Sequence, residues 1–392
     1  METNRPTGSA SGIPYARTVV ALDAGQFEAL RRAVALLFRV AHSEAYRSEV
    51  DAGADPVVRH DPGNFGVFMG YDFHLTEAGP RLIEINTNAG GALLNGVHTA
   101  SLCDPERLGG VCTGLLPVEE LQQRVVRTFR DEFAAVRGGD ATLRALAIAD
   151  ERPEEQFLAP EFELLRELFE KSQVRTGICD TGELERDAAG GLALRGDAID
   201  LVYLRDTDFR LSSERAATLR AAYLAGEVVV TPSPREHHLL ADKRRMEIFS
   251  SRETLARLGV DADDAAFLAE VVPETRPLAA MSAEEAWRDR RDWVFKPSGA
   301  FGSRAVYRGD KISRRKLQEI YPRDDFVAQR RIAPGEIEVA TSDGPQRMKF
   351  DVRAYAYRDE VLLLGARAYR GQVTNFRSPG GGFSAICVSR SS

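Results

Sequence analysis

The chain has 392 residues, which is enough for two or three domains and a substantial core. Its hydrophobic content of 43% and charged content of 28% are those of an ordinary soluble protein. Lysine and arginine number 52 against 59 acidic residues, and the resulting net charge of -7 argues against a dedicated nucleic-acid binder.

Cysteine spacing and hydropathy bear on where the protein resides. The four cysteines show no C-x-x-C spacing; they are Cys103, Cys112, Cys179 and Cys387. We therefore expect reduced, mostly buried cysteines and a cytoplasmic location. The opening stretch METNRPTGSASGIP is polar, and no stretch approaches the ~18 apolar residues of a transmembrane helix. We expect neither secretion nor a membrane span.

The first elements are a tail and a helix. Residues 1–12 are rich in glycine, serine and threonine, which predicts a disordered tail. From Asp23 to about Val50, apolar residues recur at helical spacing. This pattern predicts one amphipathic helix with Asp23 as its N-cap.

Three candidate metal ligands follow on a predicted hairpin, whose strand-like runs at 67–75 and 80–86 flank a turn signal. Asp72 lies on the first strand, while Glu84 and Asn86 are two positions apart and hence share one face of the second. An antiparallel partner can bring Asp72 beside them. Two carboxylates and an amide oxygen are hard ligands suited to Mg2+. The alternative is that Asp72 and Glu84 are simply solvated hairpin residues.

The middle of the chain predicts a small α/β layer. Residues 118–137 predict a helix that ends at Gly138 and Gly139. Strands and helices then alternate, which favours a mostly parallel sheet. The predicted strands are 143–149, 174–179, 198–204 and 227–231, and the predicted helices are 160–172 and 212–225. The stretch GELERDAAGGLALRGD predicts a hairpin insertion or irregular loop, because no strand-turn-helix context for a dinucleotide-binding motif surrounds it.

Two lysines come next. Lys243 lies in the middle of a segment whose apolar residues fall near one helical face. Lys296 ends an apolar strand and is followed by a glycine-containing turn and a second strand, in DWVFKPSGAFGSRAVYR. A lysine at the rim of a strand beside inward-pointing backbone N–H groups can bind a nucleotide's phosphates. The alternative is an ordinary hairpin with a solvated lysine.

The C-terminal part predicts strands that carry arginines. Residues 324–329 predict a strand, and a hairpin is predicted from 349–357 and 360–369, with Arg353 on one arm and Arg367 on the other. The stretch NFRSPGGGFSAICV, with Asn375 and Arg377, can shape another anion-binding loop. The alternative for each arginine is an exposed strand face.

Taken together, these pieces resemble the ATP-grasp superfamily of carboxylate-amine ligases. The resemblance rests on Lys243, on Lys296 with its glycine turn, on the strand at 326–332 and on the arginine hairpin KFDVRAYAYRDEVLLLGARAYRG. In most members an acidic residue and an E-x-N motif follow these elements. Here the matching stretch LIEINTN lies near the N-terminus. Its glutamate, Glu84, comes twelve positions after Asp72. That order resembles the circularly permuted branch typified by the glutathionylspermidine synthase ligase domain.

The resemblance covers most of 63–95 and 230–385, and it departs from the family pattern at one position. Permuted ligases often carry an arginine two residues before the acidic ligand, where this chain has Gly70. Either another arginine supplies the charge or the substrate differs; the candidates are Arg353, Arg367 and Arg377.

The resemblance implies a mixed α/β, circularly permuted ATP-grasp fold with an additional small α/β domain. Residues 13–138 would carry the metal-binding half, and 139–234 would form the small domain. Residues 235–332 would bind the nucleotide, and 333–392 would complete the sheet together with 63–95.

The implied reaction is ADP-forming amide or peptide bond formation through an acylphosphate, with ATP and Mg2+. The implied roles are Mg2+ binding by Asp72, Glu84 and Asn86, phosphate binding by Lys243 and Lys296, and a lid at Gly299, Gly302 and Ser303. Gln329, Arg330 and Ile332 would face adenine and Glu336 the ribose. Transition-state charge would be stabilised by Arg353, Arg367 and Arg377.

The sequence leaves the choice of substrates and two alternative functions open. We expect a small-molecule carboxylate and an amine, such as an amino acid, a peptide or a polyamine-like amine, with no nucleic-acid or membrane partner. A phosphotransferase acting on a stable acceptor is one alternative. A non-catalytic nucleotide-binding module is the other.

Overall fold

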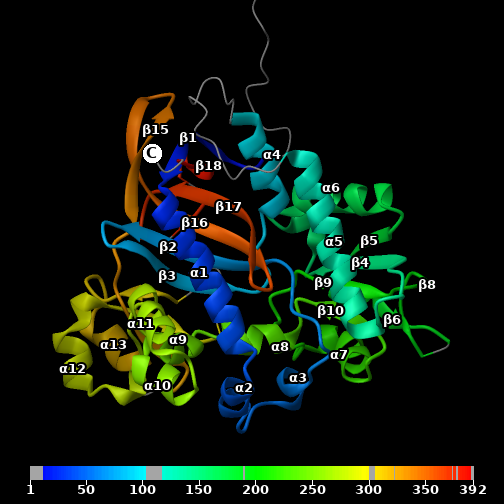
Figure 1. Ribbon diagram of the computed structural model, residues 1–392, viewed down its shortest axis with the longest axis horizontal. Helices are drawn as coiled ribbons and strands as arrows, with labels where there is room; N and C mark the ends of the chain where they lie inside the picture. Colours follow the sequence, from blue (N-terminus) through cyan, green and yellow to red (C-terminus); the bar gives the residue numbers. More distant parts are fainter. Residues whose placement is uncertain are drawn as a thin grey trace, which may run out of the picture.

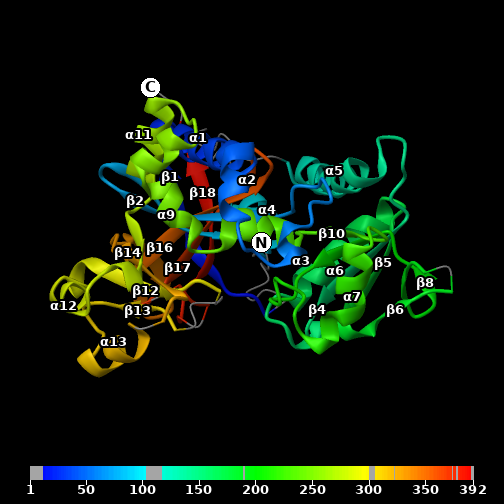
Figure 2. The ribbon, with the colours of Figure 1, turned by 90° about the horizontal axis from the view of Figure 1, so that it is seen from below.

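Three layers built on β-sheets make up the protein, for which the computed structural model describes residues 12–102 (side chains up to 99), 117–188, 190–299, 305–321, 323–372, 374–376 and 378–389. A seven-stranded sheet lies in the middle, between a parallel sheet of four strands and a small antiparallel sheet (Figures 1 and 2). Residues 1–11 of the tail predicted at 1–12 lie outside the described residues, as do Cys103 and Cys112. Cys179 and Cys387 are buried.

The central sheet joins strands from both ends of the chain, in the order β15-β1-β18-β17-β16-β2-β3. Its strands are β1 (Tyr15–Leu22), β2 (Met69–Thr76), β3 (Gly79–Asn86), β15 (Gly335–Thr341), β16 (Gly344–Tyr357), β17 (Glu360–Tyr369) and β18 (Gly382–Val388). β1 runs parallel to β18, and the β2–β3 hairpin pairs antiparallel with β16. The predicted hairpins at 67–86 and 349–369 are confirmed.

Both faces of the central sheet are covered, as the alternation along β16 shows. Val352 and Ala354 point into one core, while Tyr355 and Tyr357 point into another. The first core is covered by helices α1 (Ala24–Ala41), α9 (Arg245–Ser250), α10 (Arg252–Arg257) and α11 (Ala262–Val271). The second core contains side chains of α4 (Ala92–Leu102), α5 (Val118–Arg137) and α6 (Ala159–Lys171).

The parallel sheet confirms the predicted α/β layer. Its strands, in spatial order, are β10 (Val229–Thr231), β9 (Leu201–Leu204), β4 (Ala145–Asp150) and β5 (Arg175–Asp180). Helices α5 and α6 pack on one face, and α3 (Pro56–Arg59) and α7 (Ala217–Leu224) pack on the other. The predicted insertion forms a small sheet of β6 (Leu184–Arg186), β7 (Leu192–Leu194) and β8 (Asp197–Ala198).

The antiparallel sheet carries the predicted lysine strand. Its order is β11 (Thr275–Pro277), β14 (Phe326–Arg330), β12 (Trp293–Pro297) and β13 (Tyr307–Arg308), and α12 (Ala283–Arg288) and α13 (Arg314–Ile320) complete its core. The short helical turns elsewhere are α2 (Glu44–Val50), α8 (Pro234–Glu236), η1 (Pro153–Glu155), η2 (Thr181–Glu183), η3 (Glu214–Ala216), η4 (His237–Ala241), η5 (Leu278–Ala280) and η6 (Arg290–Asp292).

Two helix predictions are corrected. The helix expected from Asp23 to Val50 is two helices, because the Ser43 side chain accepts a hydrogen bond from the Tyr46 amide and caps α2 as a new helix. Lys243 lies in a turn between η4 and α9 rather than mid-helix. The neighbouring Asp242 carboxylate accepts from the Arg244 amide, a local bond that competes with the helical pattern.

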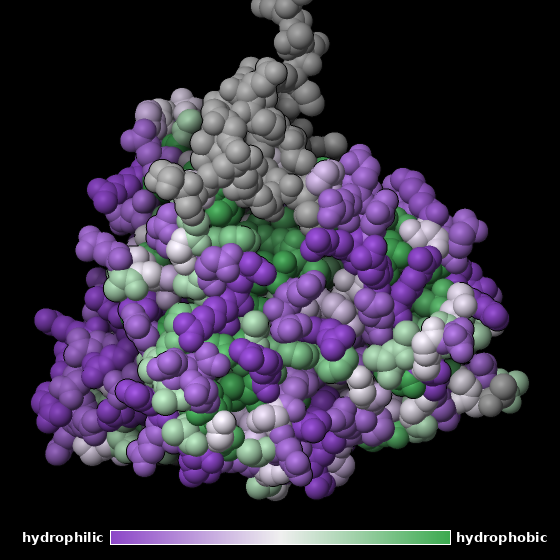
Figure 3. Space-filling model, viewed as in Figure 1, coloured by the Kyte–Doolittle hydropathy of each residue, from purple (hydrophilic) through white to green (hydrophobic). Residues whose placement is uncertain are grey.

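The surface visible in Figure 3 carries many hydrophilic side chains, as the charged content of 28% leads one to expect. Hydrophilic residues dominate the face seen in Figure 3, and the lobe of α12 and α13 is almost wholly hydrophilic there. Across the described ranges, every helix lacks the length or the apolar composition that crossing a lipid bilayer requires.

Candidate active site

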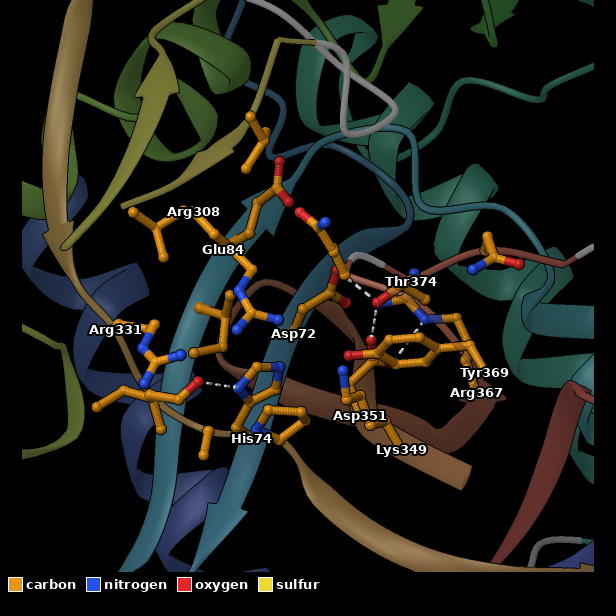
Figure 4. A pocket seen from close by; sticks show the side chains of 18 of the residues that line it. Asp72, His74, Glu84, Arg308, Arg331, Lys349, Asp351, Arg367, Tyr369 and Thr374 are labelled. Atoms are coloured by element: carbon orange, nitrogen blue, oxygen red, sulfur yellow. Dashed lines mark hydrogen bonds and ion pairs between the residues drawn. The ribbon is translucent and has the colours of Figure 1, made fainter. Parts of the chain in front are cut away.

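A cavity of about 900 Å³ lies between the central sheet and the antiparallel sheet. Strands from both ends of the chain line it, including β2 and β3 from the N-terminal part and β12, β14, β16 and β17 from the C-terminal part. Figure 4 shows charged side chains gathered around Asp72 in this cavity. The cavity contains most of the residues predicted from sequence to form the site.

The β2–β3 hairpin places the three predicted metal ligands together. In its register Asp72 lies opposite Glu84, and Gly70 lies opposite Asn86. All three side chains line the cavity, and the Asn86 amide donates to Asp72 Oδ2 at 3.1 Å. The two strands are neighbours in sequence and pair antiparallel. Side chains on their shared face therefore bring these oxygens together.

Two arginines bind the Asp72 carboxylate. Arg353 lies opposite Asp72 in the β2–β16 register, and its Nε and Nη2 atoms donate to Oδ1 and Oδ2 at 2.6 and 2.7 Å. Arg367 Nη2 lies 2.9 Å from Oδ2, and Arg367 Nε donates to Asp351 at 2.7 Å. Burial alone would raise the pKa of Asp72, but the two guanidinium groups outweigh it and hold that pKa well below its usual range.

The Gly70 position has no room for a side chain. A Cβ atom there would come within 2.4 Å of the Ala89 Cβ. It would also lie 3.4 Å from Arg353 Nε. A guanidinium from β16 thus lies beside Gly70.

Two buried lysines reach the hairpin from other segments. Lys243 Nζ lies 3.0 Å from Glu84 Oε1. Lys296 Nζ donates to the backbone oxygen of Ile83 at 2.9 Å and to Gln329 Oε1 at 2.6 Å. Burial lowers the pKa of Lys296 to about 8, although Glu84 opposes the shift. For Glu84, Lys243 and Lys296 outweigh burial and lower its pKa.

The strand predicted to face adenine forms one wall of the cavity. Gln329, Arg330 and Ile332 all line it, and the Ile332 carbonyl lies 3.0 Å from His74 Nδ1. The Gln329 side chain accepts the hydrogen bond from Lys296, so this wall also fixes the lysine. Glu336 also lines the cavity and pairs with Arg347.

Lys243 and Gly299 are not among the residues that line the cavity. Gly299 belongs to the turn after β12, where the backbone amide of Lys243 donates to the neighbouring Ser298 carbonyl at 3.5 Å. Gly302, Ser303 and Arg377 lie outside the described residues.

Sequence reasoning missed roles for His74 and Asp351 in the cavity wall. Each lies two positions from a residue that was singled out, Asp72 or Arg353, and so shares its strand face. That two-residue period is the signal that could have found them. Phe157 and Thr374, which come from loops, had no such signal.

The hairpin oxygens fit a magnesium ion in their chemistry. Within the described ranges, histidine, cysteine, aspartate and glutamate form no metal-binding cluster of three or more. Mg2+ does not require one, because one or two carboxylates commonly hold it together with substrate phosphates. Glu84 and Asn86 supply suitable oxygens, whereas Asp72 already accepts four hydrogen bonds, close to the number of lone-pair sites of a carboxylate.

Neither a family model nor a curated protein matches the chain. Among solved structures, it is similar to a glutathione synthetase-like effector (GSS30) from Globodera pallida, with 11% identity, a TM-score of 0.60 and coverage of 96% of this chain and 90% of that one. It is also similar to a putative gamma-glutamylcysteine synthetase from Methylobacillus flagellatus, with 12% identity, a TM-score of 0.50 and coverage of 94% and 88%. The chain has an ATP-grasp-type α/β fold. At such identities the likeness establishes the fold alone.

Proposed function

We propose that this chain is an ATP-dependent ligase that joins a small-molecule carboxylate to an amine through an acylphosphate and releases ADP and phosphate. The observation that carries the proposal is the hydrogen bond from Lys296 to the Ile83 backbone, 213 positions away. It puts a buried lysine next to Glu84, within one cavity that also holds Asp72 and Arg353. Phosphoryl transfer needs this kind of convergence, because its catalysis is mostly positioning and charge stabilisation.

We propose further that the fold is a circularly permuted ATP-grasp. The N-terminal hairpin β2–β3 pairs with β16 from the C-terminal part, and β1 pairs with β18. This pairing of segments from the two ends of the chain supports the proposal. We propose that this chain's relatives are the ligases of the glutathionylspermidine synthase-like branch. The proposed domains are 13–138, 139–234, 235–332 and 333–392.

The proposed residue roles follow from charge and position. Magnesium held by Glu84 and Asn86, with Asp72 beside them, would neutralise charge on the terminal phosphates of ATP. Lys296 and Lys243 donate to phosphate oxygens. Gln329, Arg330 and Ile332 face adenine, Glu336 faces the ribose, and the turn at Gly299, Gly302 and Ser303 closes as a lid.

The arginines are proposed to stabilise the charge that develops during the reaction. Arg353 and Arg367 are buried and fixed by Asp72 and Asp351, so they need little rearrangement. Arg353, which lies beside Gly70, would replace the arginine that permuted ligases often carry on the hairpin. Arg377 remains a candidate for the same role.

The substrates are proposed by class. The similar solved structures are named as glutathione synthetase-like and gamma-glutamylcysteine synthetase proteins. We therefore propose an amino acid or short peptide as the carboxylate, and an amino acid, peptide or polyamine-like compound as the amine.

The test is an ADP-release screen over pairs of such carboxylates and amines, with mass detection of the product. We expect an amide product for at least one pair, and loss of turnover in Lys296→Ala and Glu84→Ala. Lys316→Ala, on the exposed side of α13, is the matched control and should retain full activity. Unchanged turnover in both site variants would contradict the proposal.

Two other results of the screen would replace the proposed ligase function with a different one. A lasting phosphorylated acceptor, formed without any amine, would make the protein a phosphotransferase. Tight binding of Mg-ATP without turnover across the whole panel would make it a nucleotide-binding module.

A further inference from the structure

An aromatic pair lies in the wall of the cavity, formed by Phe157 and Phe376. Their ring centroids are 5.1 Å apart and their planes are inclined by 24°. Phe157 comes from the loop before α6, and Phe376 comes from the loop between β17 and β18. Phe157 is 47% exposed, more than any other large hydrophobic side chain in the described part of the chain.

Phe376 lies toward the Arg367 end of the cavity, because its ring contacts Phe383, which lies opposite Arg367 in the β17–β18 register. Thr374, two residues before Phe376, donates to Asp351, which in turn binds Arg367. Figure 4 shows Thr374 and Arg367 on the opposite side of Asp72 from Arg331, which follows the adenine strand β14. The rings therefore neighbour the end of the cavity where a second substrate would meet the transferred phosphoryl group.

The pair is anchored rather than loose. Phe376 packs on a small core of Ile13, Leu94 and Phe383, and its centroid lies 4.6 Å from that of Phe383. The loop that carries Phe157 is fixed by the Gln156 side chain, whose amide donates to the Glu151 carbonyl. An exposed ring held in place at a cavity wall retains apolar surface that a ligand can remove from water.

We propose that Phe157 and Phe376 form a subsite for an aromatic or large aliphatic side chain of the amino acid or peptide substrate. This inference rests on the proposed ligase function and adds a preference that this function does not require. The ordered rings offer stacking and apolar contact, while the charged groups around Asp72 bind the reacting end of the same molecule. One substrate molecule would place its reactive group among the charged residues and its apolar side chain against the two rings, within the same cavity.

The first experiment measures binding of three dipeptides, Gly-Gly, Gly-Leu and Gly-Phe, by calorimetry. The full-length protein is saturated beforehand with magnesium and a non-hydrolysable ATP analogue. Each dipeptide has both a free carboxylate and a free amine, so the series changes only the side chain. We expect Gly-Leu and Gly-Phe to bind roughly tenfold more tightly than Gly-Gly.

The second experiment repeats the series with Phe157→Ala, chosen because the exposed ring can be removed with little effect on folding. The preference should fall to within about threefold, while the affinity for the ATP analogue stays unchanged. Leu224→Ala is the matched control, since it removes another exposed apolar side chain, 38% exposed at the end of α7. It should keep the full preference.

The outcomes separate the subsite from the ligase. Equal binding of all three dipeptides, or an unchanged preference in Phe157→Ala, would overturn the subsite while leaving the ADP-release screen to decide the function. A loss of ATP-analogue affinity in Phe157→Ala would assign the rings to adenine and also overturn it. A clear preference in binding, with no ADP release for any substrate pair, would overturn the ligase and keep the subsite.

Discussion

Arg353 and Asp72 form a two-pronged ion pair across 281 positions of sequence, with Nε 2.6 Å from Oδ1 and Nη2 2.7 Å from Oδ2. Both side chains are largely buried, at 11% and 8% exposure. The pair fixes the N-terminal hairpin against β16, next to the proposed reaction centre.

Replacing Arg353 by leucine should lower the free energy of unfolding by about 3 kcal/mol, because Asp72 is left buried with a single guanidinium. Urea denaturation measures the change. Arg347→Leu is the control on the same strand: its side chain is 81% exposed and pairs with Glu336 at the surface, so we expect a change of about 0.5 kcal/mol. Equal changes in the two variants would show that burial does not govern the Arg353 pair.

Nucleotide binding should weaken at alkaline pH. The pKa of Lys296 is lowered to about 8, so its ammonium loses the proton, and with it a charged phosphate donor, as the pH rises through that value. We expect the affinity for an ATP analogue to fall about tenfold between about pH 7 and about pH 9.5, measured by calorimetry.

The matched variant for that experiment is Lys296→Arg, since a guanidinium stays charged across this range. Its affinity for the analogue should remain nearly level with pH. If the wild type and the variant lose affinity in parallel, a group other than Lys296 titrates.

Glu84→Gln should raise the magnesium concentration that supports half-maximal ADP release roughly tenfold or more, because it removes one of the two carboxylate charges that the hairpin contributes to the cavity. A magnesium titration at saturating ATP measures the shift. Glu77→Gln, in the exposed turn of the same hairpin, is the control and should leave the requirement unchanged. An identical magnesium dependence in all three proteins would remove Glu84 from the proposed metal site.

Gly91→Ala should destabilise the protein far more than Gly53→Ala. Both glycines have positive φ angles, 92° and 70°, so alanine strains the backbone at either position by about 1 kcal/mol. A Cβ at Gly91 would also lie 2.4 Å from the Phe383 ring, whereas at Gly53 it would meet no atom within 4 Å. We expect an additional loss of about 2 kcal/mol at Gly91, measured as the difference in unfolding free energy. Similar losses at both positions would mean that Phe383 moves aside freely.

The sequence alone predicted the parts of the site that depend on local patterns. Period-two alternation around a short turn predicted the hairpin, and with it the shared face of Asp72, Glu84 and Asn86. The apolar strand ending at Lys296 is confirmed for the same reason. Lys243, whose Nζ lies 3.0 Å from Glu84 Oε1, was wrongly predicted in mid-helix, because the side chain of Asp242 bonds the local backbone.

Only the tertiary structure decided which charges meet. That Arg353 binds Asp72, and that Lys296 bonds Gln329, depends on registers between strands far apart in the chain. Likewise, Phe157 and Phe376 come from loops of different layers, and their stacking depends on how those layers pack. Short-range periodicity fixes which face of an element a side chain occupies, but not which distant element covers that face. That choice arises from burial and close packing across the whole fold.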